Sequence, residues 1–192
     1  MKDRGTYEIF PDGSEKDISG EIPFDIPDSW EWIRHNEIID ISGGAQPPKS
    51  KFKSEPAAGY IRLFQIRDYG TTPNPVFIPE KSATKRTRKG DILLARYGAS
   101  VGKVFFAEEG AYNVAMAKVI PLFPSIINIT YLYYFYHGTI YQQLVKNNSR
   151  SAQAGFNRED MESLLFPLPP LNEQHRIVEK LGVLMKEFGA TK

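Results

Sequence analysis

The spacing of apolar residues changes once along this chain, near Pro124. Before that point, short apolar runs such as residues 60–66 and 92–95 end at glycine or charged residues, which is typical of strands. After it, residues 130–147 and 172–189 place apolar side chains three or four positions apart, which is typical of helices. The sequence therefore predicts an α+β fold, in which a β-rich domain is followed by a C-terminal helix of the coiled-coil type.

Chain length and composition favour one globular domain with an appended helix. With 192 residues, 41% of them hydrophobic, the chain can bury one core but is short for two full domains. We expect three parts: an acidic, turn-rich N-terminal segment (residues 1–28), one domain (residues 29–170) and the C-terminal helix (residues 171–192). Residues 30–44, which close at two glycines, are compatible with either a short helix or a strand.

The C-terminal helix follows two prolines and is expected to start at an N-cap, Asn172. Its apolar residues are spaced 4, 3 and 4 apart, as in a coiled-coil seam: Ile177, Leu181, Leu184 and Phe188. We assign these four residues to a subunit interface, because a lone helix would leave such a stripe exposed. The alternative is that the helix packs back on its own domain.

Nothing in the sequence indicates secretion or a membrane. The chain has no cysteine, which excludes disulfides, thiolate zinc sites and cysteine nucleophiles. Its first ten residues lack the apolar core of a signal peptide. The longest stretch without a formal charge, residues 119–145, is interrupted by Pro121 and Pro124. We therefore expect a cytoplasmic protein without a membrane partner.

The net charge of +1 conceals an uneven distribution. Residues 1–40 contain four Lys or Arg against eleven Asp or Glu, and residues 104–192 contain eight of each. Residues 41–103 contain twelve Lys or Arg against four Asp or Glu, an excess of eight positive charges. Such a region attracts polyanions such as nucleic acid, although a solvated surface gives the same pattern.

No motif for catalysis or metal binding is apparent. The segment GASVGK (residues 98–103) is similar to a phosphate-binding loop, but that loop requires glycine in place of Tyr97 and Ser or Thr in place of Val104. The histidines stand far apart, without metal-ligand spacing: His35, His137 and His175. We expect no catalytic residue, no metal site and no cofactor on this chain, which disfavours an independent hydrolase or lyase acting on DNA.

Five segments share the motifs and the order of one protein family. They are IPDSWEWIR (residues 26–34), SGGAQP (42–47), GDILLARYGASVGKV (90–104), AGFNREDMESLLFPLPPL (154–171) and PLPPLNEQHRIVEKL (167–181). Together they resemble the specificity (S) subunits of type I restriction-modification systems, over roughly residues 22–188. The resemblance covers nearly the whole chain.

This resemblance implies a DNA-reading subunit with no catalytic centre. S-adenosylmethionine, ATP and Mg are then expected only on partners, which are the modification (methyltransferase) subunit and, indirectly, the restriction subunit. A complete S subunit has two target recognition domains that each read half of a split site in double-stranded DNA, separated by long paired helices. This chain matches one recognition domain and one helix.

The chain therefore resembles half of a specificity subunit. It is either a fragment or a natural half that forms a homodimer or joins a second recognition half. The alternative function is an interaction module, which binds modification or sibling specificity subunits through its helix without reading DNA independently.

Candidate DNA contacts lie in and beside the loops of the β-rich domain. Flexible cationic side chains hold phosphates without reading sequence, and we assign this role to Lys49, Lys51, Lys53, Lys85, Arg86, Arg88, Lys89 and Lys103. Side chains with hydrogen-bonding groups can read base edges, and the candidates are Gln65, Arg67, Arg96, Tyr97, Ser100, Arg150, Ser151 and Gln153. As strand residues, Arg62 and Arg96 have a structural alternative, which is an ion pair with Asp68 or Asp91.

Local conformation is predicted at three further places. Residues 60–69 are interpreted as one strand and residues 130–147 as one helix. In the segment AGFN, Gly155 is expected to adopt an unusual backbone angle and Asn157 to cap the short helix after it.

Overall fold

The computed structural model describes residues 5–148 and 155–188, and these ranges contain twelve strands and four α-helices. The strands are β1 (Tyr7–Ile9), β2 (Glu15–Asp17), β3 (Glu31–Arg34), β4 (Ile39–Gly43), β5 (Tyr60–Phe64), β6 (Phe77–Pro79), β7 (Arg86–Thr87), β8 (Ile92–Ala95), β9 (Val104–Phe106), β10 (Gly110–Tyr112), β11 (Met116–Pro121) and β12 (Leu165–Leu168). The α-helices are α1 (His35–Ile38), α2 (Ile129–His137), α3 (Thr139–Asn148) and α4 (Leu171–Glu187). In the described ranges, no helix is long and apolar enough to cross a membrane.

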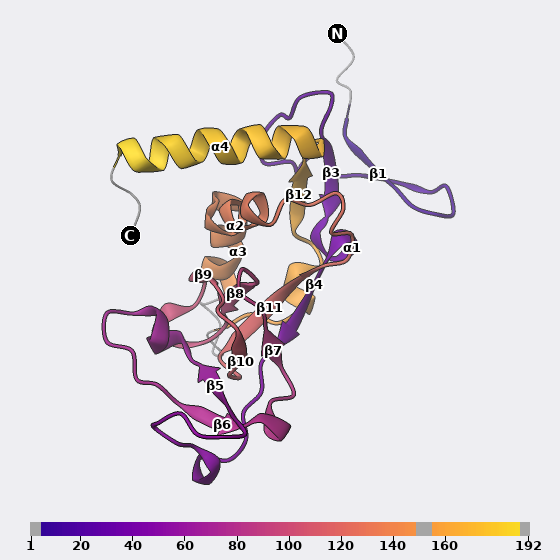
Figure 1. Ribbon diagram of the computed structural model, residues 1–192. Coiled ribbons are helices and arrows are strands. Elements are labelled where there is room, and N and C mark those ends of the chain that lie inside the picture. Colours follow the sequence, from indigo (N-terminus) through magenta and orange to yellow (C-terminus); the bar gives the residue numbers. More distant parts are fainter. Residues whose placement is uncertain (1–4, 149–154, 189–192) are drawn as a thin grey trace.

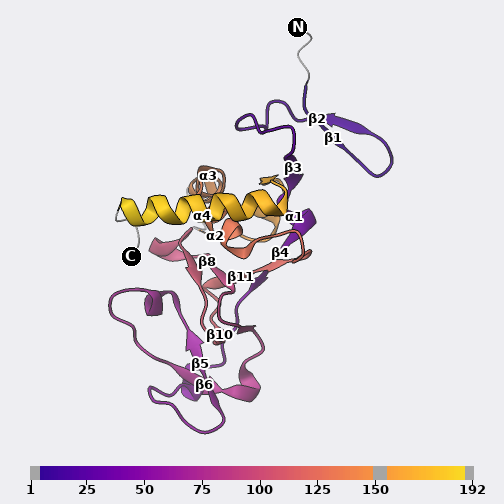
Figure 2. The same ribbon diagram turned by 45° about the horizontal axis from the view of Figure 1, so that its top comes forward.

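The elements form three tiers along the molecule (Figure 1). Helix α4 lies across α2 and α3 at one end, and a central sheet of order β4-β11-β8-β9 lies beneath these helices. An outer sheet of order β6-β5-β10-β7 occupies the end farthest from α4, as Figure 2 also shows. The β1–β2 hairpin projects to one side, and β12 pairs with β3 near the start of α4. The outer sheet and its loops are thus the part most distant from the C-terminal helix.

Strand β8 runs through the interior of the central sheet. It pairs antiparallel with both β11 and β9, and Ile92, Leu93 and Leu94 are fully buried. A run of consecutive apolar residues fits a strand that is covered on both faces. The prediction of a buried strand at residues 92–95 is therefore confirmed. The ambiguous residues 30–44 contain both conformations, because β3, the short helix α1 and β4 follow one another there.

The strand predicted over residues 60–69 is shorter than expected, since β5 ends at Phe64. Residues 66–69 form a 3-10 turn instead. Asp68 explains the break, because its carboxylate accepts a hydrogen bond of 2.8 Å from the Gln65 backbone N–H and forms an ion pair of 3.1 Å with Arg62. A short side chain that bonds to the nearby backbone favours a turn over continued strand pairing. Gln65 and Arg67 consequently lie on a turn.

The single helix predicted over residues 130–147 is divided into α2 and α3. Asn128 caps α2 as its side-chain oxygen accepts hydrogen bonds from the backbone N–H groups of Thr130 and Tyr131, at 2.9 and 3.1 Å. Gly138 ends α2 with an extended backbone (φ −76°, ψ 165°), so that α3 starts in a new direction. The apolar period continues across this break, which is why the sequence pattern did not reveal it.

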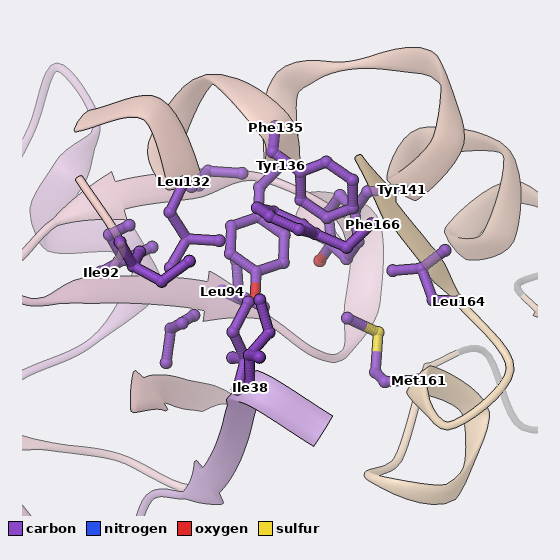
Figure 3. Packing of buried hydrophobic residues seen from close by; sticks show 14 of the residues in the cluster. Ile38, Ile92, Leu94, Leu132, Phe135, Tyr136, Tyr141, Met161, Leu164 and Phe166 are labelled. Carbon is purple, nitrogen blue, oxygen red and sulfur yellow. The ribbon is translucent and has the colours of Figure 1, made fainter. Parts of the chain in front are cut away.

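The main core lies between the central sheet and helices α2 and α3 (Figure 3). It is rich in aromatic rings, and Tyr136 and Phe166 are fully buried within it. Phe135 packs edge-to-face on Phe166, with ring centroids 4.6 Å apart. His35, at the start of α1, is buried against this cluster, and its Nε2 lies 2.6 Å from the Tyr136 hydroxyl oxygen. Residues from β8, α1, α2, α3 and β12 thus share one core.

Helix α4 begins at Leu171 with Pro170 as its N-cap residue, so Asn172 lies inside the first turn and the predicted cap is wrong. Gln174 attaches the helix to the domain and is fully buried. Its amide accepts a hydrogen bond of 2.8 Å from the Asn128 N–H and donates two of 2.9 Å to the carbonyl oxygens of Ile126 and Pro169. Removing this buried amide would leave its three hydrogen-bond partners unsatisfied, so Gln174 fixes the start of α4 on the domain.

The predicted stripe on α4 is divided between two environments. Ile177 packs against the main core, and Leu181 is half-buried. Leu184 is 37% exposed and Phe188, directly after the helix, is 80% exposed. Packing back on the domain therefore describes the first half of the stripe, and its outer half is free to contact another chain.

Candidate nucleic-acid interface

The positive charge of the middle segment gathers at the outer end of the molecule. We define the basic lobe as residues 44–91 and strand β10, which comprise the outer sheet and its loops. Residues 44–91 hold ten Lys or Arg against four Asp or Glu. In both views this lobe lies away from α4 (Figure 2). A polyanion attracted to it would approach without contacting the C-terminal helix.

Most of the predicted phosphate contacts are free, solvent-facing side chains. Within residues 5–148 and 155–188, five of them form no side-chain hydrogen bond or ion pair and are exposed: Lys49, Lys51, Arg88, Lys89 and Lys103. Lys53 is also exposed, and its Nζ lies 4.3 Å above the ring of Tyr60. Free cationic groups of this kind can move to meet phosphates. Lys103 lies outside the basic lobe, directly before β9.

Two of the predicted phosphate contacts stabilise the lobe itself. The Lys85 ammonium donates a hydrogen bond of 2.8 Å to the Ser42 hydroxyl, joining the lobe to β4. The Arg86 guanidinium forms an ion pair of 3.0 Å with Glu80 and donates to the carbonyl oxygens of Glu80 and Ala83. A phosphate would have to compete with these partners. Lys85 and Arg86 are therefore weaker candidates than the free side chains.

Sequence reasoning missed two basic residues of this region. Lys81 is exposed on a 3-10 turn after β6, and the charge excess of residues 41–103 already included it. Lys118 belongs to β11, and its ammonium donates to the Arg86 carbonyl oxygen at 3.0 Å and pairs with Asp91 at 3.3 Å. Residues 104–192 are neutral overall, so charge counting gave no signal for Lys118.

The predicted base contacts fall on two neighbouring turns. Gln65 and Arg67 lie at the turn after β5, and Arg96, Tyr97 and Ser100 lie between β8 and β9. The ring of Tyr69 in the first turn stacks on that of Phe105, with centroids 4.3 Å apart, so the first turn packs against β9, the strand that follows the second turn. The remaining three candidates lie outside the described residues: Arg150, Ser151 and Gln153.

The structural alternative for Arg62 is confirmed, and the one for Arg96 is wrong. Arg62 pairs with Asp68, whose side chain is almost fully buried. Asp91 pairs with Lys118 instead of Arg96. Arg96 donates hydrogen bonds to the segment that follows residue 154, which is distant in sequence. Sequence distance explains why this partner was not foreseen.

The interpretation of the AGFN segment is also corrected. Positive φ angles occur at five glycines among the described residues, and Gly155 is not one of them. Gly155 is required for space, because a Cβ there would lie 2.5 Å from the Tyr97 ring. Asn157 does not cap the following turn, since its side-chain oxygen accepts a hydrogen bond of 3.1 Å from Arg96. Both residues serve contacts with the turn between β8 and β9.

The opposite, N-terminal end of the molecule is acidic. Arg34 binds both carboxylate oxygens of Glu8, at 2.9 and 2.7 Å, and also Glu21 at 2.8 Å, which attaches the β1–β2 hairpin to β3. Hydrogen bonds from Arg34 hold the pKa of the Glu8 and Glu21 carboxyls below their usual range. A groove of about 590 Å³ beside the hairpin is lined by Glu8, Asp25, Asp28, Glu31 and Glu37, among others. Phosphates would be repelled there.

Neither a metal centre nor a phosphate-binding loop is formed by the described residues. No group of three or more His, Asp or Glu in residues 5–148 and 155–188 could hold a metal ion. The arrangement can bind an extended polyanion at one end, and its turn residues can offer hydrogen-bonding groups to it.

The model of one family, the type I restriction modification DNA specificity domain, matches residues 27–192. This chain belongs to that family. The resemblance found in the sequence is therefore confirmed. The predicted α+β class is confirmed as well, because solved structures of specificity subunits have the same fold.

Similar proteins come from both archaea and bacteria. The MjaVIII specificity subunit of Methanocaldococcus jannaschii is 26% identical over 161 residues, which cover 82% of this chain and 36% of that protein. The EcoBI specificity subunit of Escherichia coli is 29% identical over 172 residues, which cover 83% of this chain and 35% of that protein. The chain thus spans little more than a third of the length of these specificity subunits.

Solved structures show the same relation. The HsdS subunit of Thermoanaerobacter tengcongensis is 29% identical, with a TM-score of 0.68 over 88% of this chain and 40% of that chain. A chain from a study of assembly and conformational transition of the type I restriction-modification system is 28% identical, with a TM-score of 0.71 over 88% of this chain and 41% of that chain. This DNA specificity domain therefore corresponds to about two fifths of a complete subunit.

Proposed function

We propose that this specificity domain is one target recognition unit with its connecting helix, which reads one part of a split site in double-stranded DNA. In this proposal it directs a modification subunit and, indirectly, a restriction subunit, which bind S-adenosylmethionine, ATP and Mg. The observation that carries it is the basic lobe, whose unpaired cationic side chains face solvent at the end away from α4. Family membership specifies DNA as the polyanion.

The proposed contacts divide by chemistry. The free cationic groups hold phosphates and set the orientation of the DNA: Lys49, Lys51, Lys53, Arg88, Lys89 and Lys103, with Lys85 and Arg86 in a lesser role. Side chains on the turns after β5 and β8 meet base edges, and the candidates there are Arg67, Tyr97 and Ser100, with Gln65 weaker because its amide nitrogen is buried. Arg96, a base contact by sequence, is instead bonded within the protein. The remaining candidates, Arg150, Ser151 and Gln153, lie outside the described residues. This division makes separate predictions for affinity and for specificity.

The test is a selection for bound DNA sequences. The chain is co-expressed with its cognate modification subunit, and the purified complex is mixed with a pool of random duplexes at moderate salt. Sequencing of the retained DNA should reveal one enriched short motif. A motif that occurs twice with palindromic symmetry supports a homodimer of halves, whereas a single motif supports a lone recognition half or a pair with a different second half.

The second candidate function is an interaction module. It is favoured by the exposed outer half of the α4 stripe, where Leu184 and Phe188 face solvent. Such a module would form a stable complex with a modification or sibling specificity subunit and enrich no DNA motif. Stable complex formation without enrichment would thus support the module and contradict DNA reading.

A single substitution in the lobe should change the salt dependence of DNA binding. We expect Arg88→Ala to make the slope of log K against log [salt] shallower by about one unit, because one phosphate contact and its released counterion are lost. Fluorescence anisotropy of a labelled duplex at several salt concentrations measures this slope. Arg86→Ala is the matched comparison, since Glu80 already neutralises that guanidinium, and its slope should change less. An unchanged slope for Arg88→Ala would contradict the assignment.

A further inference from the structure

Helix α3 holds the turn between β8 and β9 in place. Gly102 has a φ of +84°, which favours glycine, and the Gln142 side-chain amide of α3 donates a hydrogen bond of 3.0 Å to its carbonyl oxygen. A Cβ at Gly102 would lie 2.9 Å from Val145, so α3 packs closely against the turn. The side chains that this turn exposes are therefore carried on a rigid support.

Arg96 stands at the base of the same turn, and its guanidinium is already engaged. Its Nε donates a hydrogen bond of 3.2 Å to the Phe156 carbonyl oxygen, and its Nη2 donates one of 3.1 Å to the Asn157 side chain. Its Nη1 fills the space beside Gly43 of β4, where a Cβ would lie 2.6 Å away. Nε and Nη2, a pair of donors that could form a bidentate fork to guanine, are thus already bonded within the protein.

Tyr97, the next residue, is held in place and yet presented to solvent. Its backbone forms an isolated antiparallel bridge with Gly155, and one edge of its ring lies over that glycine. The Arg96 guanidinium carbon lies 5.0 Å from the ring centroid. The residue nevertheless remains 43% exposed. An aromatic ring that is ordered before binding loses little entropy when it contacts a ligand.

We propose that Tyr97 reads thymine by contact of its ring with the 5-methyl group, and that Arg96 is the positioning residue that holds this ring. The thymine methyl is the apolar feature that the major groove displays, so an exposed ring on a rigid turn matches it. Lys103, exposed at the other end of the turn, is placed to hold a phosphate nearby. This inference rests on the proposed function, since it requires that the chain reads DNA.

The experiment replaces thymine by uracil, which differs only in lacking the methyl group. Each thymine of the selected motif is exchanged for deoxyuridine in turn, and binding of the chain in complex with its modification subunit is measured. At one position we expect wild-type affinity to fall about fourfold, the effect of one lost methyl contact. Tyr97→Phe should retain this discrimination because the ring is kept, and Tyr97→Ala should abolish it.

Arg96 is tested by two independent substitutions. Arg96→Gln removes the guanidinium, and Gly43→Ala displaces it without altering Arg96 itself. Both should reduce the preference for thymine over uracil at that position, and the double variant should lose no more than either single one. Neither should change the salt slope, because a positioning residue makes no phosphate contact. A slope that falls by about one unit in Arg96→Gln would show a phosphate contact and overturn the positioning role.

The outcomes separate this inference from the proposed function. If the wild-type complex enriches no motif, the proposed function fails. If it enriches a motif but no thymine position responds to uracil in a Tyr97-dependent way, this inference fails and DNA reading stands. Loss of discrimination in Tyr97→Phe would assign the reading to the hydroxyl group and overturn the methyl contact.

Discussion

A variant with four alanine substitutions in the basic lobe should bind DNA on the order of a thousandfold more weakly than the wild type at about 0.15 M salt. The substituted residues are exposed and unpaired among the described residues: Lys49, Lys51, Arg88 and Lys89. Each phosphate contact releases counterions, so the loss of four should make the slope of log K against log [salt] shallower by about 3.6 units. Since no side chain of the core is altered, folding should be unaffected.

The measurement is anisotropy titration of the complex with its modification subunit, over a range of salt concentrations. A control variant carries Lys180→Ala and Lys186→Ala, which remove exposed charges from α4 at the opposite end of the molecule. The control should keep the wild-type slope. About half of the loss in the control, which removes two charges instead of four, would mean that net charge, and not the basic lobe, governs binding.

Lowering the pH from 7 to about 4.5 should reduce the free energy of unfolding by about 2 to 3 kcal/mol through His35 alone. Burial lowers the pKa of His35 from 6.5 to about 4. Between these two values the unfolded chain binds a proton and the folded chain does not, so stability falls as the pH falls. The Glu8 and Glu21 carboxyls, which bind Arg34, also have lowered pKa values. Their contribution to the free energy of unfolding is lost only at lower pH, below about 4.5.

Chemical denaturation at a series of pH values tests this prediction. In His35→Asn the decline between pH 6.5 and 4.5 should be much smaller, although the variant should be less stable at pH 7 because the contact with Tyr136 is altered. His175→Gln is the control, since that residue is exposed on α4 and its removal should leave the decline unchanged. A decline that persists in His35→Asn would show that other groups cause it.

Much of the architecture was predictable because it depends on local patterns. The buried strand at residues 92–95 and the C-terminal helix follow from runs and periods of apolar residues, which any covered strand or one-sided helix must show. The break between α2 and α3 was not predictable, because the apolar period passes through Gly138 unchanged. The end of β5 at Phe64 depends on an aspartate that bonds to the backbone, a competition that period alone does not report.

In the candidate interface, too, some features were predictable from the sequence and others were not. The excess of eight positive charges in residues 41–103 was visible as a count, and it lies largely on the outer tier. Which of those charges are free was not visible. Arg62, Lys85 and Arg86 have partners within the protein, and each partner became known from the folded arrangement. A count of charges cannot distinguish a side chain that holds the fold from one that faces solvent.

The sequence by itself determined the α+β class, the segregation of charge and membership of the type I DNA specificity family, because each depends on residue type and order along the chain. Tertiary structure alone decided that Arg96 faces Asn157, sixty-one positions away, and that Gly155 makes room for the ring of Tyr97. The physical reason is the distance along the chain over which each property depends on its neighbours. Periodicity and charge are local properties of a chain, whereas a hydrogen-bond partner or a close contact exists only after folding brings distant segments together.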